Sequence, residues 1–296
     1  MSYLSKWKRL GGKDMIVVKT LFKIVLLGLA LLAGEIAGGM IAQALLHPAA
    51  MAMTHDGPFD LTQALWLMTA AYALALALYA AQLRGGFLSR TGALFVILYV
   101  TGSALSVIET VYFNDYVKLP AILLEETALT SLIQAAIVAP VAAALWRGAA
   151  GDAGTINGET ISGLGWRLAL IIPLYIAFYF GAGQFVAWQG AALRAYYEQG
   201  QHIDRAHVAL LQVFRGAIWA GLTWMSVRQL TGRPLARALT IGVVFAVIMV
   251  MPLVIPNPYM PWDVRKMHFL EIASSNFLFG ILAAGLLLSG LKTRNV

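Results

Sequence analysis

The sequence contains no cysteine among its 296 residues. This absence excludes disulfide bonds, thiolate metal sites and cysteine nucleophiles. Charged residues are also scarce, at 12% of the chain, whereas a soluble domain is usually about one quarter charged. Polar stretches long enough to form a soluble domain are lacking too. Any chemistry therefore has to use apolar helices and the short loops between them.

Familiar catalytic and nucleotide-binding motifs are missing as well. The chain has no Walker loop, no Gly-x-Ser-x-Gly, no His-Glu-x-x-His and no dinucleotide-binding glycine fingerprint. Paired histidines in facing spans, which a b-type haem requires, are not evident. The sequence therefore assigns neither a cofactor nor a metal.

What the chain has in abundance is apolar sequence. It is 60% hydrophobic, and apolar runs of about 20 residues recur, each long enough to span a hydrocarbon core about 30 Å thick. The sequence therefore predicts an all-α polytopic membrane protein. The eight predicted transmembrane helices cover residues 20–46, 61–82, 88–112, 122–146, 166–189, 207–229, 235–255 and 268–290.

Lys and Arg residues are distributed unevenly between the two predicted faces. With the N-terminus inside, the outer face carries only Lys118, Arg194, Arg205, Arg265 and Lys266 of the 21 Lys and Arg residues. Arg215 lies within a span, and the rest lie inside. The positive-inside rule then places both termini in the cytoplasm. We expect a multi-pass protein of the plasma membrane, the cytoplasmic membrane of a bacterium, with the lipid bilayer as its partner and no nucleic acid bound.

Two segments half a chain apart resemble each other. QLRGGFLSR, residues 82–90, and QLTGRPLAR, residues 229–237, share Gln, Leu, Gly, Leu and Arg at an ungapped offset of 147 residues. The same offset pairs Tyr112 with Tyr259. We therefore predict an internal duplication, with two parallel four-helix repeats related by a pseudo-two-fold axis along the membrane normal.

This duplication implies the domain organisation. Residues 1–147 form the N-terminal repeat, 148–165 a cytoplasmic linker, and 166–296 the C-terminal repeat. The first 13 residues mix basic residues with Trp7 and Leu10, which predicts a segment lying on the anionic inner leaflet. A frayed basic tail is the alternative.

Polar residues follow one face or the outer end of the third and fourth predicted spans. They are Ser106 and Glu109 on the third span, and Glu125, Glu126, Thr130 and Gln134 on the fourth. In hydrocarbon an unpaired polar group costs several kcal/mol, so these faces have to contact other helices or water. Hydrogen bonds between helices explain Ser and Thr, whereas carboxylates favour a polar cavity open to the outer face.

The last predicted span opens with VRKMHFLEIASSNFLFG, residues 264–280. Its polar residues are His268, Glu271, Ser275 and Asn276. At 100° per residue the first three lie within about 60° on one helix face. His-x-x-Glu on one face can contribute to a metal site, or it can pair an imidazole with a carboxylate for proton transfer. Two ligands are too few for zinc, so we expect a hydrogen-bonded pair on one wall of an outer vestibule, with the fourth span as the other wall.

Two ionisable residues are predicted near the middle of the bilayer. Glu35 in the first span and Arg215 in the sixth lie about 15–18 Å below the outer ends of their helices, at 1.5 Å per residue. A lone charge at that depth costs from about 3 to more than 10 kcal/mol. Mutual pairing is the least costly arrangement. The pair could be static or could act as a proton or anion relay, and an Arg that reaches the interface is the alternative to pairing. Gly34 and Gly38 beside Glu35 permit close helix approach.

These features leave three classes of function open. The first is a transporter or permease-like protein that takes a small solute or a lipid-like molecule into a polar cavity from the outer side. The second is a membrane-embedded enzyme acting on a lipid or isoprenoid substrate, with a metal as an option. The third is a non-catalytic partner or receptor subunit. The aromatic segment PLYIAFYFGAGQF, residues 173–185, could line a pocket or serve only in packing.

Overall fold

The chain folds into a bundle of long helices. A computed structural model describes residues 12–48, 56–148, 159–198 and 205–293. Within these ranges the regular secondary structure is helical apart from one short two-stranded sheet, and eight helical stretches are long and apolar enough to cross a membrane. The expected multi-pass, helical membrane fold is confirmed at this level. The basic N-terminal segment and most of the linker lie outside the described residues.

The eight spans follow the predicted ranges closely. The first four are α2 (Gly12–Leu46), α3 (Leu61–Ala80), a third span made of α4 (Phe87–Val96), the π-helical η1 (Ile97–Ala104) and α5 (Leu105–Tyr112), and α7 (Ala121–Leu145). The last four are α8 (Leu164–Phe185), α10 (Arg205–Gln229), α11 (Pro234–Val250) continued by the 3₁₀ turn η4 (Met251–Val254), and α12 (Trp262–Leu288). The short elements are α6 (Asn114–Val117), β1 (Glu159–Ile161), η3 (Ala187–Gln189), α9 (Ala191–Glu198) and β2 (Leu291–Thr293).

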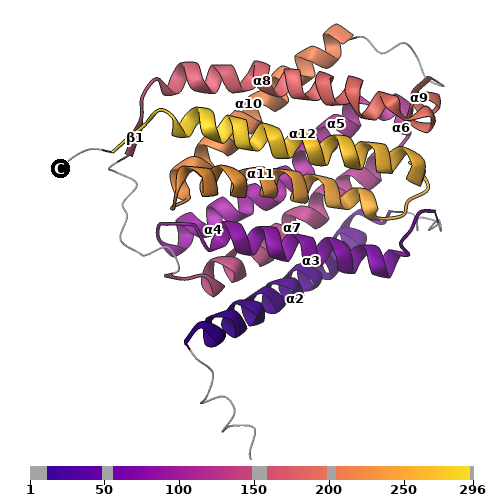
Figure 1. Cartoon of the computed structure of the whole chain (residues 1–296). Helices are drawn as coiled ribbons and strands as arrows, with labels where there is room; N and C mark the ends of the chain where they lie inside the picture. The colour runs from indigo at the N-terminus through magenta and orange to yellow at the C-terminus, as the bar shows by residue number, and fades with distance from the viewer. Residues whose placement is uncertain (1–11, 49–55, 149–158, 199–204, 294–296) are drawn as a thin grey trace, which may run out of the picture.

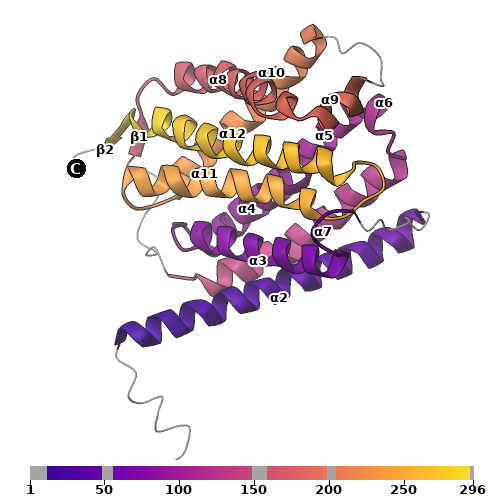
Figure 2. The same ribbon diagram turned by 45° about the vertical axis from the view of Figure 1, so that its right-hand side comes forward.

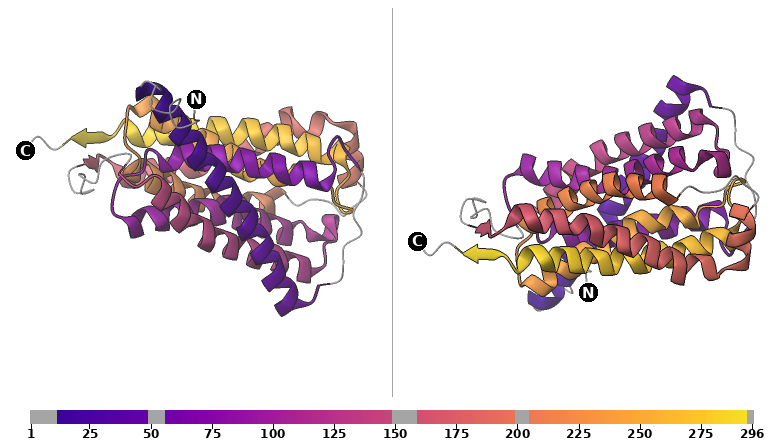
Figure 3. Two further views of the ribbon diagram at one scale, coloured as in Figure 1. Left: turned by 90° about the horizontal axis from the view of Figure 1, so that it is seen from below. Right: turned by 90° about the horizontal axis from the view of Figure 1, so that it is seen from above.

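The long helices lie side by side, except that α2 crosses the edge of the bundle obliquely (Figures 1 and 2). The antiparallel strands β1 and β2 lie at one end, and α6 and α9 lie at the opposite end. We call these the sheet end and the α9 end. The start of α2 and the end of α12 both lie at the sheet end (Figure 3).

Local sequence signals explain where several helices begin. Asp60 caps α3: its carboxylate accepts from the backbone N–H of Gln63, and the Gln63 side chain accepts from the backbone N–H of Asp60, which satisfies otherwise free N–H groups. Before α4 and α11 the chain turns through Gly85 and Gly232, whose φ angles are 96° and 102°. Only glycine adopts these values without strain.

The two halves of the chain contact each other through these turns. Leu83 and Leu230 form an antiparallel β-bridge. One turn earlier in each helix, the Tyr79 hydroxyl donates to Ser226 Oγ at 2.9 Å. A buried Arg closes each turn, since Arg90 donates to the carbonyl of Ala80 and Arg237 donates to that of Val227.

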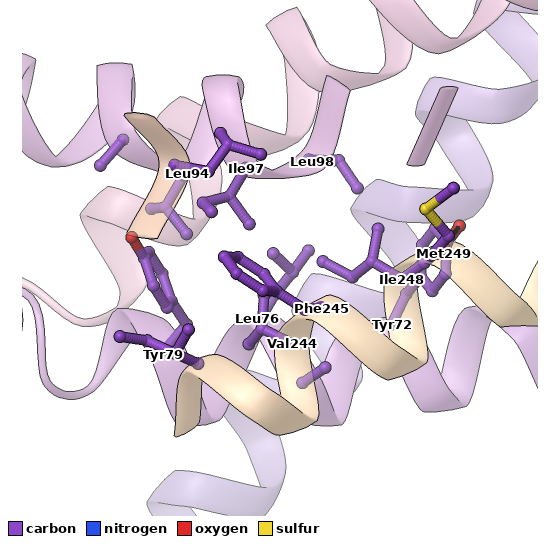
Figure 4. Packing of buried hydrophobic residues seen from close by; sticks show 14 of the residues in the cluster. Tyr72, Leu76, Tyr79, Leu94, Ile97, Leu98, Val244, Phe245, Ile248 and Met249 are labelled. Atoms are coloured by element: carbon purple, nitrogen blue, oxygen red, sulfur yellow. Dashed lines mark hydrogen bonds between the residues drawn. The ribbon is translucent and has the colours of Figure 1, made fainter. Parts of the chain in front are cut away.

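The core lies where α3 packs against α11 and α4–η1 (Figure 4). Leu76, Leu94, Ile97 and Phe245 are fully buried there. Tyr72 closes one side by donating its hydroxyl to the Ile248 carbonyl at 2.6 Å. Because the hydroxyls of Tyr72 and Tyr79 both have hydrogen-bond partners, these tyrosines can pack among aliphatic side chains at little cost.

The third span is not a regular α-helix. Its middle, η1, is π-helical, and π segments are frequent at functional sites because they interrupt the regular hydrogen-bond ladder. Thr101 and Ser103 in this segment are buried, and their hydroxyl oxygens have no hydrogen-bond partner within the described ranges. Nothing in the hydropathy of the span predicted this irregularity.

Helix α2 packs against α7 through small residues. A Cβ at Gly38 would lie 2.5 Å from the Thr130 backbone oxygen, and a Cβ at Gly34 would lie 3.1 Å from Gln134 Cγ. Gln134 in turn donates its side-chain amide to the Leu31 carbonyl at 3.2 Å. The Gly-x-x-x-Gly of α2 therefore does allow close helix approach, as small residues do in membrane helix pairs.

This contact generates a stability prediction. Gly38→Ala should lower the free energy of unfolding by about 1–3 kcal/mol, because the new methyl group overlaps the backbone of α7. Gly39→Ala is the matched control, since a Cβ there meets nothing within 4 Å. Unfolding in mixed detergent micelles measures both. Equal stability of the two variants would show that α2 and α7 do not pack closely.

Candidate functional site

A cavity of about 1140 Å³ lies at the α9 end, between α5, α8, α10 and α12. It is larger than most small-molecule pockets, which measure about 300–1,000 Å³. Most of the residues predicted from the sequence line it, namely Ser106, Glu109, Arg215, His268, Glu271, Ser275 and Asn276. The aromatic residues Tyr175, Phe178, Tyr179 and Phe180 of α8 line it too.

Arg215 is the most deeply buried charge of this cavity. Its Nη1 lies 2.8 Å from Glu109 Oε1, and the side chains are 2% and 24% exposed, respectively. The same Nη1 donates to Gln212 Oε1 at 2.9 Å. The rings of Tyr175 and Tyr179 lie 5.7 and 6.0 Å from the guanidinium carbon. A guanidinium can be buried here because a carboxylate neutralises it and aromatic rings flank it.

The partner of Arg215 is therefore Glu109 and not Glu35. The sequence predicts Arg215 and Glu35 at the same depth, but a shared depth does not bring two helices together. Glu35 lies on α2, which packs against α7 and α3, and it does not line the cavity. Arg215 lies on α10, whose face meets the third span at Glu109.

The polar face of α7 also points elsewhere. Thr130 and Gln134 are buried against α2, as the close approach of Gly34 and Gly38 shows. Glu125 and Glu126 precede them on α7, and neither lines the cavity. The vestibule wall expected from the fourth span is thus provided by α8 and α10.

His268 and Glu271 form the expected pair on α12. His268 Nδ1 lies 2.9 Å from Glu271 Oε2, and the side chains are 20% and 13% exposed. The other ring nitrogen, Nε2, lies 3.1 Å from the Tyr197 hydroxyl. With that hydroxyl donating to Nε2, the imidazole proton is on Nδ1 and is donated to Glu271. A hydrogen-bonded chain therefore runs from α9 through His268 to the carboxylate.

Tyr197 is held in its neutral form. Burial raises the pKa of its phenol well above the usual range, and the charges of Glu109 and Glu271 together with Tyr196 raise it further. Burial and negative neighbours both disfavour the phenolate. The hydroxyl therefore remains a hydrogen-bond donor at neutral pH.

Helix α9 contributes residues to the lining of the cavity, whereas the sequence predicts only an outer loop here. Leu193 is buried against Ala187 and Val264, which anchors α9 on α12. Arg194 donates to the Trp188 carbonyl at 2.5 Å, which holds α9 against η3. The only sequence signal for this element is the short pattern of Leu193 followed by Tyr196 and Tyr197 on one helix face.

The opening of α12 is fixed by a buried Arg. Arg265 pairs with Asp56 at 2.7 Å and donates to the carbonyls of Leu253 and Ile255. Asn257 stabilises the preceding turn, because its side-chain oxygen accepts the backbone N–H of Met260. These contacts set the position from which His268 and Glu271 reach the cavity.

An aromatic cluster separates the cavity from the rest of the bundle. The Trp219 ring lies 6.2 Å from Tyr175, 5.9 Å from Phe279 and 4.5 Å from Phe245, measured between ring centroids. All four side chains are buried. Trp219 follows Arg215 by one helical turn on α10 and therefore lies further from the α9 end. We call Trp219, Tyr175, Phe245 and Phe279 the aromatic floor of the cavity.

Within the described ranges, no group of three or more His, Cys, Asp or Glu could hold a metal ion. Comparison of the chain with protein-family models, with curated proteins and with solved structures found no match. Any functional proposal therefore depends on the geometry and chemistry of the cavity.

The ion pair yields a prediction about coupling. Glu109→Gln should lower the free energy of unfolding by about 3 kcal/mol, near the lower end for breaking a buried pair because Glu109 is partly exposed. In the double variant Glu109→Gln, Arg215→Met, the loss of unfolding free energy should be smaller than the sum of the losses in the two single variants. A double-mutant cycle from unfolding in mixed micelles measures the coupling.

The matched cycle combines Glu35→Gln with Arg215→Met. Because Glu35 does not contact Arg215, these costs should add. Coupling to Glu35 with none to Glu109 would contradict the observed pairing.

Proposed function

We propose that the protein is a transporter or permease-like protein of the plasma membrane, whose cavity takes a small solute or a lipid-like molecule from the outer side. One observation carries the proposal: a cavity of about 1140 Å³ with an ion pair at its depth, aromatic walls and a covering helix. A solvated cavity explains why carboxylates occur in a membrane bundle.

The distribution of charge supports the orientation. The described bases Arg84, Arg147, Arg167 and Arg233 precede or follow spans at the sheet end. Under the positive-inside rule the sheet end is then cytoplasmic, and the α9 end with its cavity is external. The N-terminus and C-terminus belong to the cytoplasmic side in this orientation.

We further propose that the two halves are repeats, residues 1–147 and 166–296. The offset of 147 residues relates Tyr79 to Ser226 and Leu83 to Leu230, and each of these residues contacts its own mate. A residue that touches its mate lies next to a two-fold axis. The matching φ angles of Gly85 and Gly232 support the same axis.

The aromatic floor supports a transport cycle. In alternating access the binding site is open to one side and closed to the other. Trp219, Phe245 and Phe279 close the cavity toward the sheet end, and the Arg215–Glu109 pair lies directly above them. We assign the floor and the ion pair the role of the inner gate.

A second function is favoured by one observation. The chain of Glu271, His268 and Tyr197 resembles an acid–base arrangement, in which a carboxylate orients an imidazole toward a hydroxyl. An enzyme acting on a lipid at the outer interface would use this chain and would need no opening toward the sheet end.

Cysteine labelling distinguishes these functions, because the chain has no cysteine of its own. Ser275→Cys places one thiol in the cavity, and a membrane-impermeant maleimide is applied to right-side-out and to inverted vesicles. Transport predicts that Cys at this position is labelled from the outer side and, as the gate opens, from the inner side as well. Labelling from the outer side alone would contradict alternating access and favour the enzyme.

Three controls accompany this experiment. Ser274→Cys lies on the exposed outside of α12, faces lipid, and should resist labelling from either side. Asp263→Cys at the α9 end and Arg147→Cys at the sheet end report vesicle sidedness. If Asp263→Cys were labelled from the cytoplasmic side, the proposed orientation would be wrong.

A further inference from the structure

We propose that the cavity recognises a positively charged head group, an ammonium, which lies between the carboxylates of Glu271 and Glu109 and the rings of Trp188 and Tyr197. This inference rests on the proposed function, because it assumes that the cavity binds a ligand. It adds the chemical class of that ligand.

Apart from Arg194 and Glu198 on α9, the charged atoms that a ligand can reach in this cavity are the carboxylate oxygens of Glu109 and Glu271. The Arg215 side chain is 2% exposed and already contacts Glu109 and Gln212. The side chains of Glu109 and Glu271 are 24% and 13% exposed. An anionic ligand at this position would be repelled by these carboxylates before it reached the Arg215 guanidinium, whereas a cationic ligand would be attracted by them.

The balance of charge in the cavity is negative. Arg215 neutralises Glu109. With His268 counted as neutral, no full positive charge offsets Glu271; the imidazole contacts Glu271 Oε2 through Nδ1 at 2.9 Å, and its Nε2 lies 3.1 Å from the Tyr197 hydroxyl. The pKa of Tyr197, raised by burial, keeps the phenol neutral and available as the donor to His268.

The remaining charged residues of the lining do not alter this balance. Arg194 and Glu198 both lie on α9, one helical turn apart, and carry opposite charges. A monovalent cation at Glu271 would therefore bring the enclosed cavity close to neutrality, which lowers the cost of keeping a carboxylate away from bulk water.

Gly183 on α8 lines the cavity at the proposed head-group position. A Cβ built there would lie 3.6 Å from Glu271 Oε1 and 3.9 Å from Trp188 Cδ1, so carboxylate and indole flank the same position. Glu271 Oε2 is used by His268, whereas Oε1 points toward this position. The Trp188 and Tyr197 rings lie 6.1 Å apart between centroids. Aromatic faces attract ammonium groups, most strongly after desolvation.

The cavity has room for more than the head group. Its volume of about 1140 Å³ extends along Phe178 and Phe180, which present apolar surface. Phe180 is 37% exposed, so an alkyl chain could follow α8 from the head-group position along its ring. The ammonium could thus belong to an amphipathic molecule or to a free small amine, and the two are separated by experiment.

The test uses the full chain in lipid nanodiscs and isothermal titration calorimetry, with empty nanodiscs subtracted. The probes are decyltrimethylammonium, decyl sulfate and tetramethylammonium. We expect decyltrimethylammonium to bind at least about tenfold more tightly than decyl sulfate. The reason is that the carboxylate attracts the first head group and repels the second, which should separate the two dissociation constants by at least about a factor of ten. Equal or tighter binding of decyl sulfate overturns the inference.

Variants locate the contact. Glu271→Gln, which keeps shape and removes charge, should weaken decyltrimethylammonium binding about tenfold. Glu125→Gln, an exposed acid outside the cavity, should leave it unchanged. Gly183→Leu fills the head-group position and should abolish binding, whereas Gly181→Leu, where a Cβ meets nothing within 4 Å, should not. Unchanged affinity in Glu271→Gln would also overturn the inference.

Two further results separate the questions. If tetramethylammonium binds as tightly as decyltrimethylammonium, the ligand is a small amine; if only the alkyl form binds, it is amphipathic, and both results support the inference. A further variant, Ser275→Trp, places an indole in the cavity next to Glu271 and Asn276. If neither decyl probe binds the wild type more tightly than this variant, the proposed binding function fails and the ammonium site fails with it. Cavity binding of decyl sulfate alone refutes only the ammonium site.

Discussion

The buried ion pair between Arg215 and Glu109 is the interaction on which the functional end of the bundle depends. A guanidinium this far inside an apolar bundle is tolerated only with a carboxylate beside it. The pair at 2.8 Å therefore fixes which face of α10 meets the third span. With that contact set, α8 and α12 form the remaining walls, and their polar and aromatic residues converge on one cavity. The aromatic floor begins one helical turn further along α10.

The same arrangement divides the charges into two classes. One carboxylate, Glu109, pairs with the buried Arg215, and the other, Glu271, contacts His268. Tyr197 links this second carboxylate to the covering helix α9. A ligand that enters the cavity therefore meets a pre-organised carboxylate next to aromatic rings, while the buried cation serves the scaffold. In these proposals Glu109 and Arg215 belong to the gate, and Glu271 belongs to the ammonium site above it.

The sequence predicted the spans well because hydropathy and length alone decide which segments can cross a bilayer. Ends were less accurate: α12 begins at Trp262, directly after Pro261, rather than at 268. Proline favours the first positions of a helix, and Asp263 suits its first turn, so these signals were available. The pair of His268 and Glu271 was predicted because both residues lie on one helix, where spacing determines contact.

Contacts between different helices could not be predicted in this way. Glu35 and Arg215 share a predicted depth, yet depth says nothing about which helices are neighbours, and Arg215 on α10 pairs with Glu109 on α5. The polar face of α7 was identified correctly as one face, but Gly34 and Gly38 bring it against α2. Helix α9 was missed because eight residues with polar neighbours give no periodic signal distinct from a loop.

An experimental structure in lipid nanodiscs tests the central claim most directly. The account predicts density joining the Arg215 guanidinium to the Glu109 carboxylate, with an open cavity above it bounded by α8, α12 and α9. Arg215 paired with Glu35, or a cavity filled by the side chains of α8 and α12, would contradict it.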